Sequence, residues 1–214
     1  SPSNPTGTAL NKHDLHEISS TVRDLGGNLI VDEIYHGLGF DGRFPSILEI
    51  DSDAFVLNSF SKYFGMTGWR LGWLVAPEEA VREMEKLAQH LFISVSTPAQ
   101  YAALACFEKS TRNILDDRRE IFRERKDFLL PALSSIGFSI PCGPEGAFYI
   151  YADAEKFTKD SDFFCMDLLE KQGVAITPGT DFGVNGAANH IRFAFTADTE
   201  RLSTAIDRIA LMVN

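Results

Sequence analysis

The sequence predicts an α/β protein in which a mostly parallel sheet is followed by a smaller α+β domain. In the first part, short apolar segments end in polar or charged residues at 29–33 and 54–62, with helical and loop segments between them. This pattern is typical of buried parallel strands joined by crossovers. After Gly137 the helical and strand segments become short and follow one another closely, as in an α+β domain. We place the domain boundary near residue 111, which gives domains 1–110 and 111–214.

The elements of the first part follow from the spacing of apolar residues. From Asn11, which can cap a helix together with Asp14, apolar residues recur at helical spacing until Gly26 and Gly27, and this predicts one amphipathic helix. Three apolar runs at 29–31, 54–57 and 71–76 predict strands that are buried on both faces.

Further helices of the first part lead into the second part, whose other elements are shorter. Helices are predicted at 78–92 and from 97 to about 136, with a break near Ser110 and Thr111. Strands are predicted at 138–140, 147–151, 174–176 and 190–195, a helix at 161–172, and a final helix from Asp198.

Composition and charge exclude several classes of protein. The 214 residues are 44% hydrophobic and 23% charged, which describes a globular chain that buries a core. With 30 acidic and 20 basic residues, the net charge is −10, and this charge repels phosphate backbones and anionic membranes. We therefore expect neither nucleic acid nor a membrane as a partner. Three widely spaced cysteines and the lack of a long apolar run favour a cytoplasmic protein.

Lys62 is the first candidate for chemistry because it follows a predicted strand, where ligands of parallel sheets bind. A lysine in such a crevice can have a lowered pKa and form an imine with an aldehyde. Ser59, Ser61 and the glycine-rich stretch after Lys62, with Arg70 eight positions on (70 − 62 = 8), supply donors of the kind that hold a phosphate. The sequence lacks the glycine-rich loop of nucleoside triphosphate sites. Taken alone, a lysine after a strand is more often structural or solvent-facing, and it is the surrounding donors that make Lys62 a candidate.

Asp32 and Tyr35 are the next candidates. Asp32 ends an apolar strand, where a buried carboxylate needs a partner, and a protonated ring nitrogen would satisfy it. Tyr35 can reach the same pocket and donate to an oxygen. The alternative is an aspartate bound by backbone amides beside a core tyrosine. His13, His16 and Glu17 share a helix face, but we interpret this face as solvated and expect no metal.

Four motifs follow one another along the chain, at 3–7, 32–35, 59–72 and 190–193. The separations between Asn4 and Asp32 (32 − 4 = 28) and between Asp32 and Lys62 (62 − 32 = 30) agree as well. With these motifs the chain resembles the class I and II aminotransferases of the pyridoxal-phosphate-dependent fold-type-I (aspartate aminotransferase) superfamily. The resemblance implies the second half of the large cofactor-binding domain followed by a small carboxyl-terminal domain, with the amino-terminal half absent.

The resemblance also implies roles for individual residues toward pyridoxal 5′-phosphate. Lys62 would form the Schiff base with the cofactor and then carry the proton in catalysis, while Asp32 would pair with the pyridinium nitrogen. Asn4 and Tyr35 would donate to the phenolic oxygen of the cofactor.

The remaining roles concern the phosphate and the substrate. Ser59, Arg70 and Ser61 would hold the phosphate of the cofactor. Arg192 would bind the α-carboxylate of the substrate, with Asn4 beside it. No metal is implied.

The function implied by the resemblance is an amino-acid aminotransferase that works by ping-pong transfer of an amino group from an amino acid to a 2-oxo acid. The complete protein is expected to be a homodimer, and the expectation of activity applies to that complete protein. A carbon–sulfur β-lyase or a synthase on the same fold is one alternative. The other is the aminotransferase-like sensor domain of a transcription regulator. The cofactor motifs do not separate these functions, because function depends on the substrate pocket.

Overall fold

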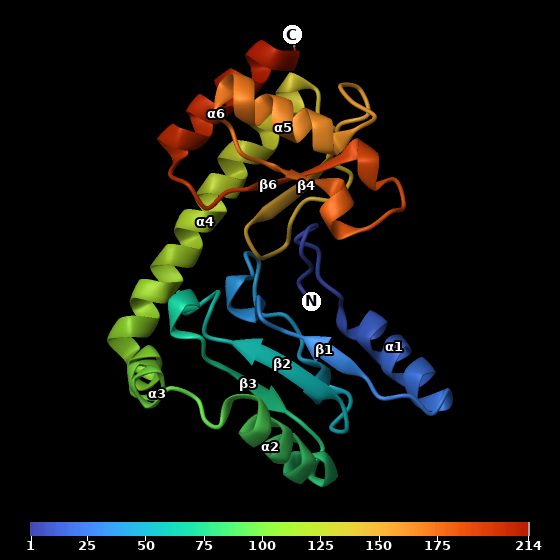
Figure 1. The fold of residues 1–214 in the computed structure, drawn as a ribbon, viewed down its shortest axis with the longest axis vertical. Helices are drawn as coiled ribbons and strands as arrows, with labels where there is room; N and C mark the ends of the chain where they lie inside the picture. Colours follow the sequence, from blue (N-terminus) through green and yellow to red (C-terminus); the bar gives the residue numbers. More distant parts are fainter. Residues whose placement is uncertain (214) are drawn as a thin grey trace. The chain divides into compact units, whose positions relative to one another are not determined.

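The computed structural model describes residues 1–213, which form two compact units (Figure 1). The first unit contains Ser1–Pro2 and Ala9–Arg119, and the second contains Ser3–Thr8 and the chain from Glu120 onward. The division therefore falls inside helix α4 (Lys109–Ile136), eight residues after the expected boundary near residue 111 (119 − 111 = 8). The domain boundary of the complete protein stays a prediction.

The first unit is built on a three-stranded sheet of β1 (Ile30–Asp32), β2 (Phe55–Ser59) and β3 (Gly72–Val75), with β2 in the centre (Figure 1). β1 and β2 are parallel, as expected, but β3 runs antiparallel to β2. The physical reason is the connection between β2 and β3, whose only helical segment is the short 3₁₀ helix Thr67–Trp69. A parallel return would need a longer crossover.

The expectation that these strands are buried on both faces is wrong for the described chain. All four residues of β3 are exposed, and Ile30 of β1 is 62% exposed. Only one face packs, where Val56 of β2 joins a core cluster with Leu15 and Ile47. The other face of the sheet is not covered by the described chain and exposes apolar side chains. The apolar runs therefore predicted the strands correctly but not the exposure of one face of the sheet.

The helices of the first unit begin and end close to the predicted residues. α1 (Lys12–Asp24) starts at a complete capping box formed by Asn11 and Asp14, which confirms that prediction. α2 (Glu78–Phe92) also matches its prediction. After α3 (Thr97–Leu104) and the 3₁₀ helix Ala105–Phe107, the helical conformation is interrupted at Glu108, which has extended dihedral angles. The break was predicted two residues later, near Ser110 and Thr111.

The second unit is an α+β arrangement around an antiparallel sheet. Its strands β4 (Tyr149–Asp153), β5 (Thr177–Pro178) and β6 (His190–Ala194) have the order β4-β6-β5. Figure 1 shows α5 (Ser161–Gln172) and α6 (Thr199–Val213) lying together on one side of this sheet. The strand predicted at 138–140 is a single bridge between Ser139 and Asp153, and the one predicted at 174–176 lies at β5. Within residues 1–213, no helix has the length and apolar composition that a membrane span requires.

Candidate active site

The parallel pairing of β1 and β2 brings Asp32 and Lys62 to one edge of the first sheet. Asp32 ends β1 and is in register with Leu57 of β2, which ends two residues later at Ser59. Lys62 follows three residues beyond that end (62 − 59 = 3). The Lys62 Nζ atom lies 5.6 Å from the centroid of the Tyr35 ring. An amine, a carboxylate and a phenol thus meet where parallel sheets bind ligands.

The Asp32 carboxylate is held by the turn that follows it. Its Oδ1 atom accepts a hydrogen bond from the backbone N–H of Ile34 at 2.9 Å. A carboxylate can accept several hydrogen bonds, so this side chain can also accept one from a ligand. Tyr35 is buried, with 6% of its surface exposed.

The two serines and Arg70 frame the loop that carries Lys62. Ser59 Oγ lies 2.9 Å from Ser61 Oγ and accepts from the backbone N–H of Ser61 at 3.0 Å. Arg70 adopts the left-handed region at φ 53° and donates from Nη1 to the Thr67 carbonyl oxygen at 3.1 Å. Space is open beside Gly68, since a Cβ there would meet nothing within 4 Å. Hydroxyl and guanidinium groups on one loop are donors of the kind that bind a small anion.

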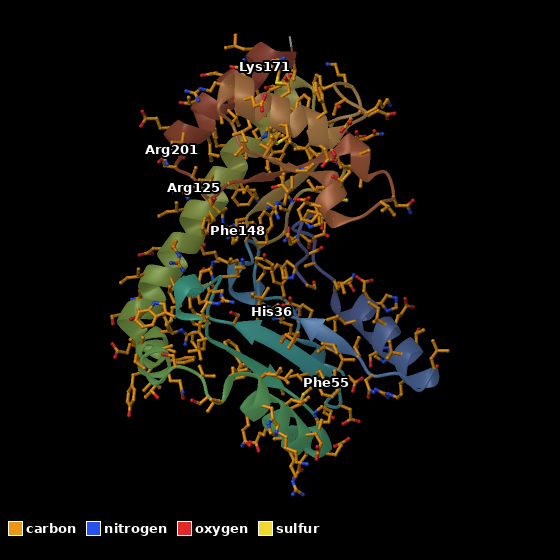
Figure 2. The ribbon with its side chains drawn as sticks, in the orientation of Figure 1. His36, Phe55, Arg125, Phe148, Lys171 and Arg201 are labelled. Carbon is orange, nitrogen blue, oxygen red and sulfur yellow. The ribbon has the colours of Figure 1, made fainter. Side chains whose placement is uncertain are left out.

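A buried acid behind this edge was missed by the sequence analysis. Glu33 is 4% exposed, and its Oε1 atom accepts from Ser46 Oγ and from the backbone N–H of Ile47, both at 2.9 Å. His36 Nδ1 lies 3.3 Å from Oε2, and Figure 2 shows His36 just beyond the end of β1. Burial lowers the pKa of His36, while the Glu33 carboxylate acts to raise it. Glu33 thereby fixes the turn between Asp32 and Tyr35.

Replacing Glu33 with alanine is expected to lower the free energy of unfolding by about 1–3 kcal/mol, because the Ile47 N–H and the Ser46 hydroxyl lose their acceptor. The midpoint of urea unfolding measures this change. Glu17→Ala is the matched control, since Glu17 is exposed and pairs only with the exposed His13, so its effect should stay within about 0.5 kcal/mol. Equal midpoints for the two variants would contradict the role of Glu33.

The second unit contains a separate group of polar side chains around Arg192 of β6. Arg192 Nη1 donates to Asn4 Oδ1 at 2.8 Å, and Nη2 donates to Thr177 Oγ1 at 3.1 Å. The segment Ser3–Thr8 belongs to this unit, which explains how residues 188 positions apart in the sequence meet. The pairing of β5 with β6, which sets Thr177 opposite Arg192, supplies the third member.

Aromatic rings enclose the Arg192 guanidinium. Its Cζ atom lies 4.4 Å from the centroid of the Tyr149 ring and 4.8 Å from that of Phe182, and such rings hold a planar cation in place. The Nε atom is buried and has no hydrogen-bond partner in the described chain. A buried donor without an acceptor is costly, so the arrangement is suited to an anion that supplies further acceptor oxygens.

The sequence analysis identified Arg192 and Asn4 but not the residues that hold them. Tyr149 and Phe182 lie in two segments with clear turn residues, 143–149 and 178–183, and Thr177 comes just before the second. Their place around Arg192 depends on strand pairing across the second unit, which apolar periodicity does not reveal. In the part of the chain that the structure describes, no group of three or more His, Cys, Asp or Glu residues is placed to hold a metal ion.

The residues of the first unit fit the chemical groups of pyridoxal 5′-phosphate. The Asp32 carboxylate suits a protonated ring nitrogen, and the Tyr35 phenol can donate to an oxygen on the ring. The Lys62 amine suits an aldehyde. The open space at Gly68 with the nearby hydroxyls and Arg70 suits a phosphate. Each group of this cofactor therefore has a complementary side chain in the chain.

Known proteins that are similar to this chain are aminotransferases. The family model for aminotransferase class I and II matches residues 1–209. A valine–pyruvate aminotransferase of Mycobacterium tuberculosis is 37% identical over 211 residues, which cover 98% of this chain and 54% of that protein. An aspartate aminotransferase of Thermotoga maritima is 35% identical over 217 residues, covering 100% of this chain and 55% of that protein. The chain belongs to the class I and II aminotransferase family.

Solved structures place the fold in the same family. The crystal structure of an aminotransferase from Mycobacterium tuberculosis superposes with a TM-score of 0.95 at 36% identity, covering 100% of this chain and 56% of that one. A variant aspartate aminotransferase of Thermus thermophilus gives a TM-score of 0.92 at 33% identity, covering 99% of this chain and 58% of that one. The chain spans about half the length of the relatives it matches.

Proposed function

We propose that the complete protein is a pyridoxal-phosphate-dependent amino-acid aminotransferase that transfers an amino group to a 2-oxo acid in two half-reactions. The observation that carries the proposal is the meeting of Lys62, Asp32 and Tyr35 at the carboxyl ends of the parallel strands β1 and β2. Membership of the aminotransferase family supports it, and so do relatives that are named aminotransferases.

Six residues of the first unit would hold the cofactor. Asp32 would accept a charged hydrogen bond from the protonated ring nitrogen and so keep that nitrogen protonated, and the Tyr35 phenol would donate to the ring oxygen. Arg70 and the hydroxyls of Ser59 and Ser61 hold the phosphate. The sixth residue, Lys62, is the covalent attachment point.

Pyridoxal phosphate supplies an aldehyde that an amine can attack and a ring that accepts the electrons of a substrate carbanion. Lys62 provides the amine of the resting enzyme. The Nζ atom of Lys62 would act as a general base that removes the proton from the substrate α-carbon. The same atom would hold that proton and deliver it to the aldehyde carbon of the cofactor, so one side chain would serve both half-reactions.

Arg192 would bind the α-carboxylate that all amino-acid and 2-oxo-acid substrates share. A guanidinium binds a carboxylate through two parallel hydrogen bonds, and Nε of Arg192 is a buried donor that lacks an acceptor in the described residues. Asn4 holds Nη1 with its Oδ1 atom, which leaves its amide N–H groups to donate to the cofactor or the substrate. These contacts would bind the group that amino acids share and therefore indicate no particular amino acid.

The choice of amino acid stays outside the proposal because the relatives differ in it. They are named for valine and pyruvate, for aspartate, and for N-acetyl-LL-diaminopimelate. The proposal also includes a cytoplasmic homodimer as the form of the complete protein.

Product analysis tests the proposed reaction. With an amino acid donor and 2-oxoglutarate, the complete protein should form glutamate and the 2-oxo acid of the donor in equal amounts, and it should release no free ammonia. Pyruvate and ammonia from a cysteine conjugate, without glutamate, would instead assign the protein to the carbon–sulfur lyases. An upstream basic winged-helix domain and no turnover would assign it to the transcription regulators.

A further inference from the structure

Helix α4 holds the residue that directly follows Lys62. Tyr63 Oη donates a hydrogen bond to Asp116 Oδ1 at 2.8 Å. The carbonyl oxygen of Tyr63 accepts a hydrogen bond from Arg118 Nη2. Both α4 residues belong to the same compact unit as Lys62. One helix therefore fixes both the side chain and the backbone of Tyr63.

The backbone on both sides of Lys62 is restrained. The Ser61 carbonyl accepts from Thr67 Oγ1 at 2.6 Å, and the Lys62 carbonyl accepts from the Gly65 N–H at 3.1 Å. These two hydrogen bonds lie within the loop between β2 and β3. The hydrogen bond from Arg118 to Tyr63 is different, because it ties the same loop to another element. A restrained backbone limits the directions that the Lys62 side chain can take.

The Tyr63 ring also contacts the segment that carries Tyr35. Gly37 packs so closely on this ring that a Cβ at Gly37 would overlap the Tyr63 side chain. Lys62 Nζ lies 5.6 Å from the centroid of the Tyr35 ring. Tyr63 therefore connects the loop that carries Lys62 with the segment that carries Tyr35.

The Tyr63 phenol keeps its proton and therefore remains a hydrogen-bond donor. Burial raises the pKa of Tyr63 to about 12, and the hydrogen bond to Asp116 acts in the same direction. Arg119, which lies 3.1 Å from Asp116 Oδ1, and Arg112 oppose this rise. The phenol stays protonated throughout the neutral range and donates to Asp116.

We propose that Tyr63 and Asp116 are positioning residues that direct the Lys62 amine toward the cofactor aldehyde and the substrate α-carbon. The inference rests on the proposed function, because that function gives Lys62 its role. Proton transfer and covalent attachment depend steeply on geometry, and a misplacement of about 1 Å can cost roughly a hundredfold in rate. Both residues act on Lys62 through the peptide chain rather than by touching the substrate.

Four variants of the complete protein test the proposal. Tyr63→Phe removes only the hydroxyl, and Asp116→Ala removes its acceptor. Asp116→Asn keeps an acceptor oxygen at the same place. Asp117→Asn is the matched control, because it makes the same change of charge at the adjacent, exposed position of α4. For each variant, kcat and KM for an amino acid substrate are measured with the fraction of Lys62 modified by borohydride at a subsaturating concentration of pyridoxal phosphate.

Tyr63→Phe and Asp116→Ala should each lower kcat by about fivefold to tenfold, as expected for one lost hydrogen bond that orients a reacting group. KM should stay within about twofold, and the fraction of modified Lys62 should fall. Asp116→Asn should restore most of kcat, and Asp117→Asn should match the unchanged protein. The double variant Tyr63→Phe/Asp116→Ala should be no worse than either single variant, because both remove the same interaction.

The outcomes separate this inference from the function on which it rests. Unchanged kcat and Lys62 modification in Tyr63→Phe, with Lys62→Ala inactive, would overturn the positioning role and leave the proposed function intact. A lower kcat accompanied by a higher KM and a lower melting temperature, none of which Asp116→Asn restores, would also overturn it. No Lys62 adduct in the unchanged protein would overturn the proposed function and this inference together. If Asp116→Ala does not fold, Tyr63→Phe carries the test, since it removes a single oxygen atom.

Discussion

Replacing Lys62 with alanine is expected to abolish transamination by the complete protein and to leave its fold intact. The amine of Lys62 is the proposed attachment point of the cofactor and the base at the substrate α-carbon, and loss of a general base alone costs about 10²–10⁴ in rate. Lys62 is partly exposed in the loop between β2 and β3, so its truncation leaves no large cavity. The measurement is kcat in the glutamate-forming assay, with circular dichroism as the check of fold.

Lys86→Ala is the control for this prediction, because Lys86 is exposed on α2 and pairs with Glu83. Its kcat should equal that of the unchanged protein. Appreciable transamination by Lys62→Ala would show that the assignment of the covalent residue is wrong. Addition of a small external amine should restore part of the lost rate in Lys62→Ala, since it replaces the missing base.

Replacing Arg192 with alanine is expected to raise KM for every amino acid and 2-oxo acid substrate by about tenfold to a hundredfold. This range corresponds to the loss of a hydrogen bond to a charged group, about 1.5–3 kcal/mol. The effect should be common to all substrates, because the α-carboxylate is the group that they share. Arg192→Lys should recover only part of the affinity, since an ammonium cannot make the paired hydrogen bonds of a guanidinium.

Arg201→Ala is the matched control for Arg192. Arg201 lies at the exposed start of α6, where Figure 2 labels it, and its loss should leave KM unchanged. An increase in KM confined to one substrate would contradict the proposed role, because it would place Arg192 against a side chain rather than against the carboxylate. The Arg192 contacts with Asn4 and Thr177 predict that Asn4→Ala raises KM in the same direction by a smaller factor.

Local sequence signals were enough to predict most helices of this chain. Asn11 and Asp14 form the expected capping box, and α2 and α5 have their expected bounds. In each case the signal lies within one helix: a capping residue, a helical period and a stop. The direction of β3 was not predicted, because it depends on whether the 60–71 connection forms a crossover helix, and apolar composition does not decide this.

The candidate site was predictable in part, for a similar reason. Lys62, Asp32 and Arg192 stand in motifs that can be read along the chain. The contacts that support them come from distant segments. Ser46, for example, donates to Glu33, which directly follows Asp32. Asp116, which holds Tyr63, lies 53 residues further along the chain, in α4. Such contacts are set by tertiary packing, and only the structure brings them together.

The most direct test of the central claim is the mass of the complete protein after incubation with pyridoxal phosphate and reduction with borohydride, followed by peptide mapping. We predict one adduct per chain, on Lys62, and no adduct in Lys62→Ala. An adduct on another lysine, or none at all in the unchanged complete protein, would contradict the assignment of Lys62 and the function derived from it.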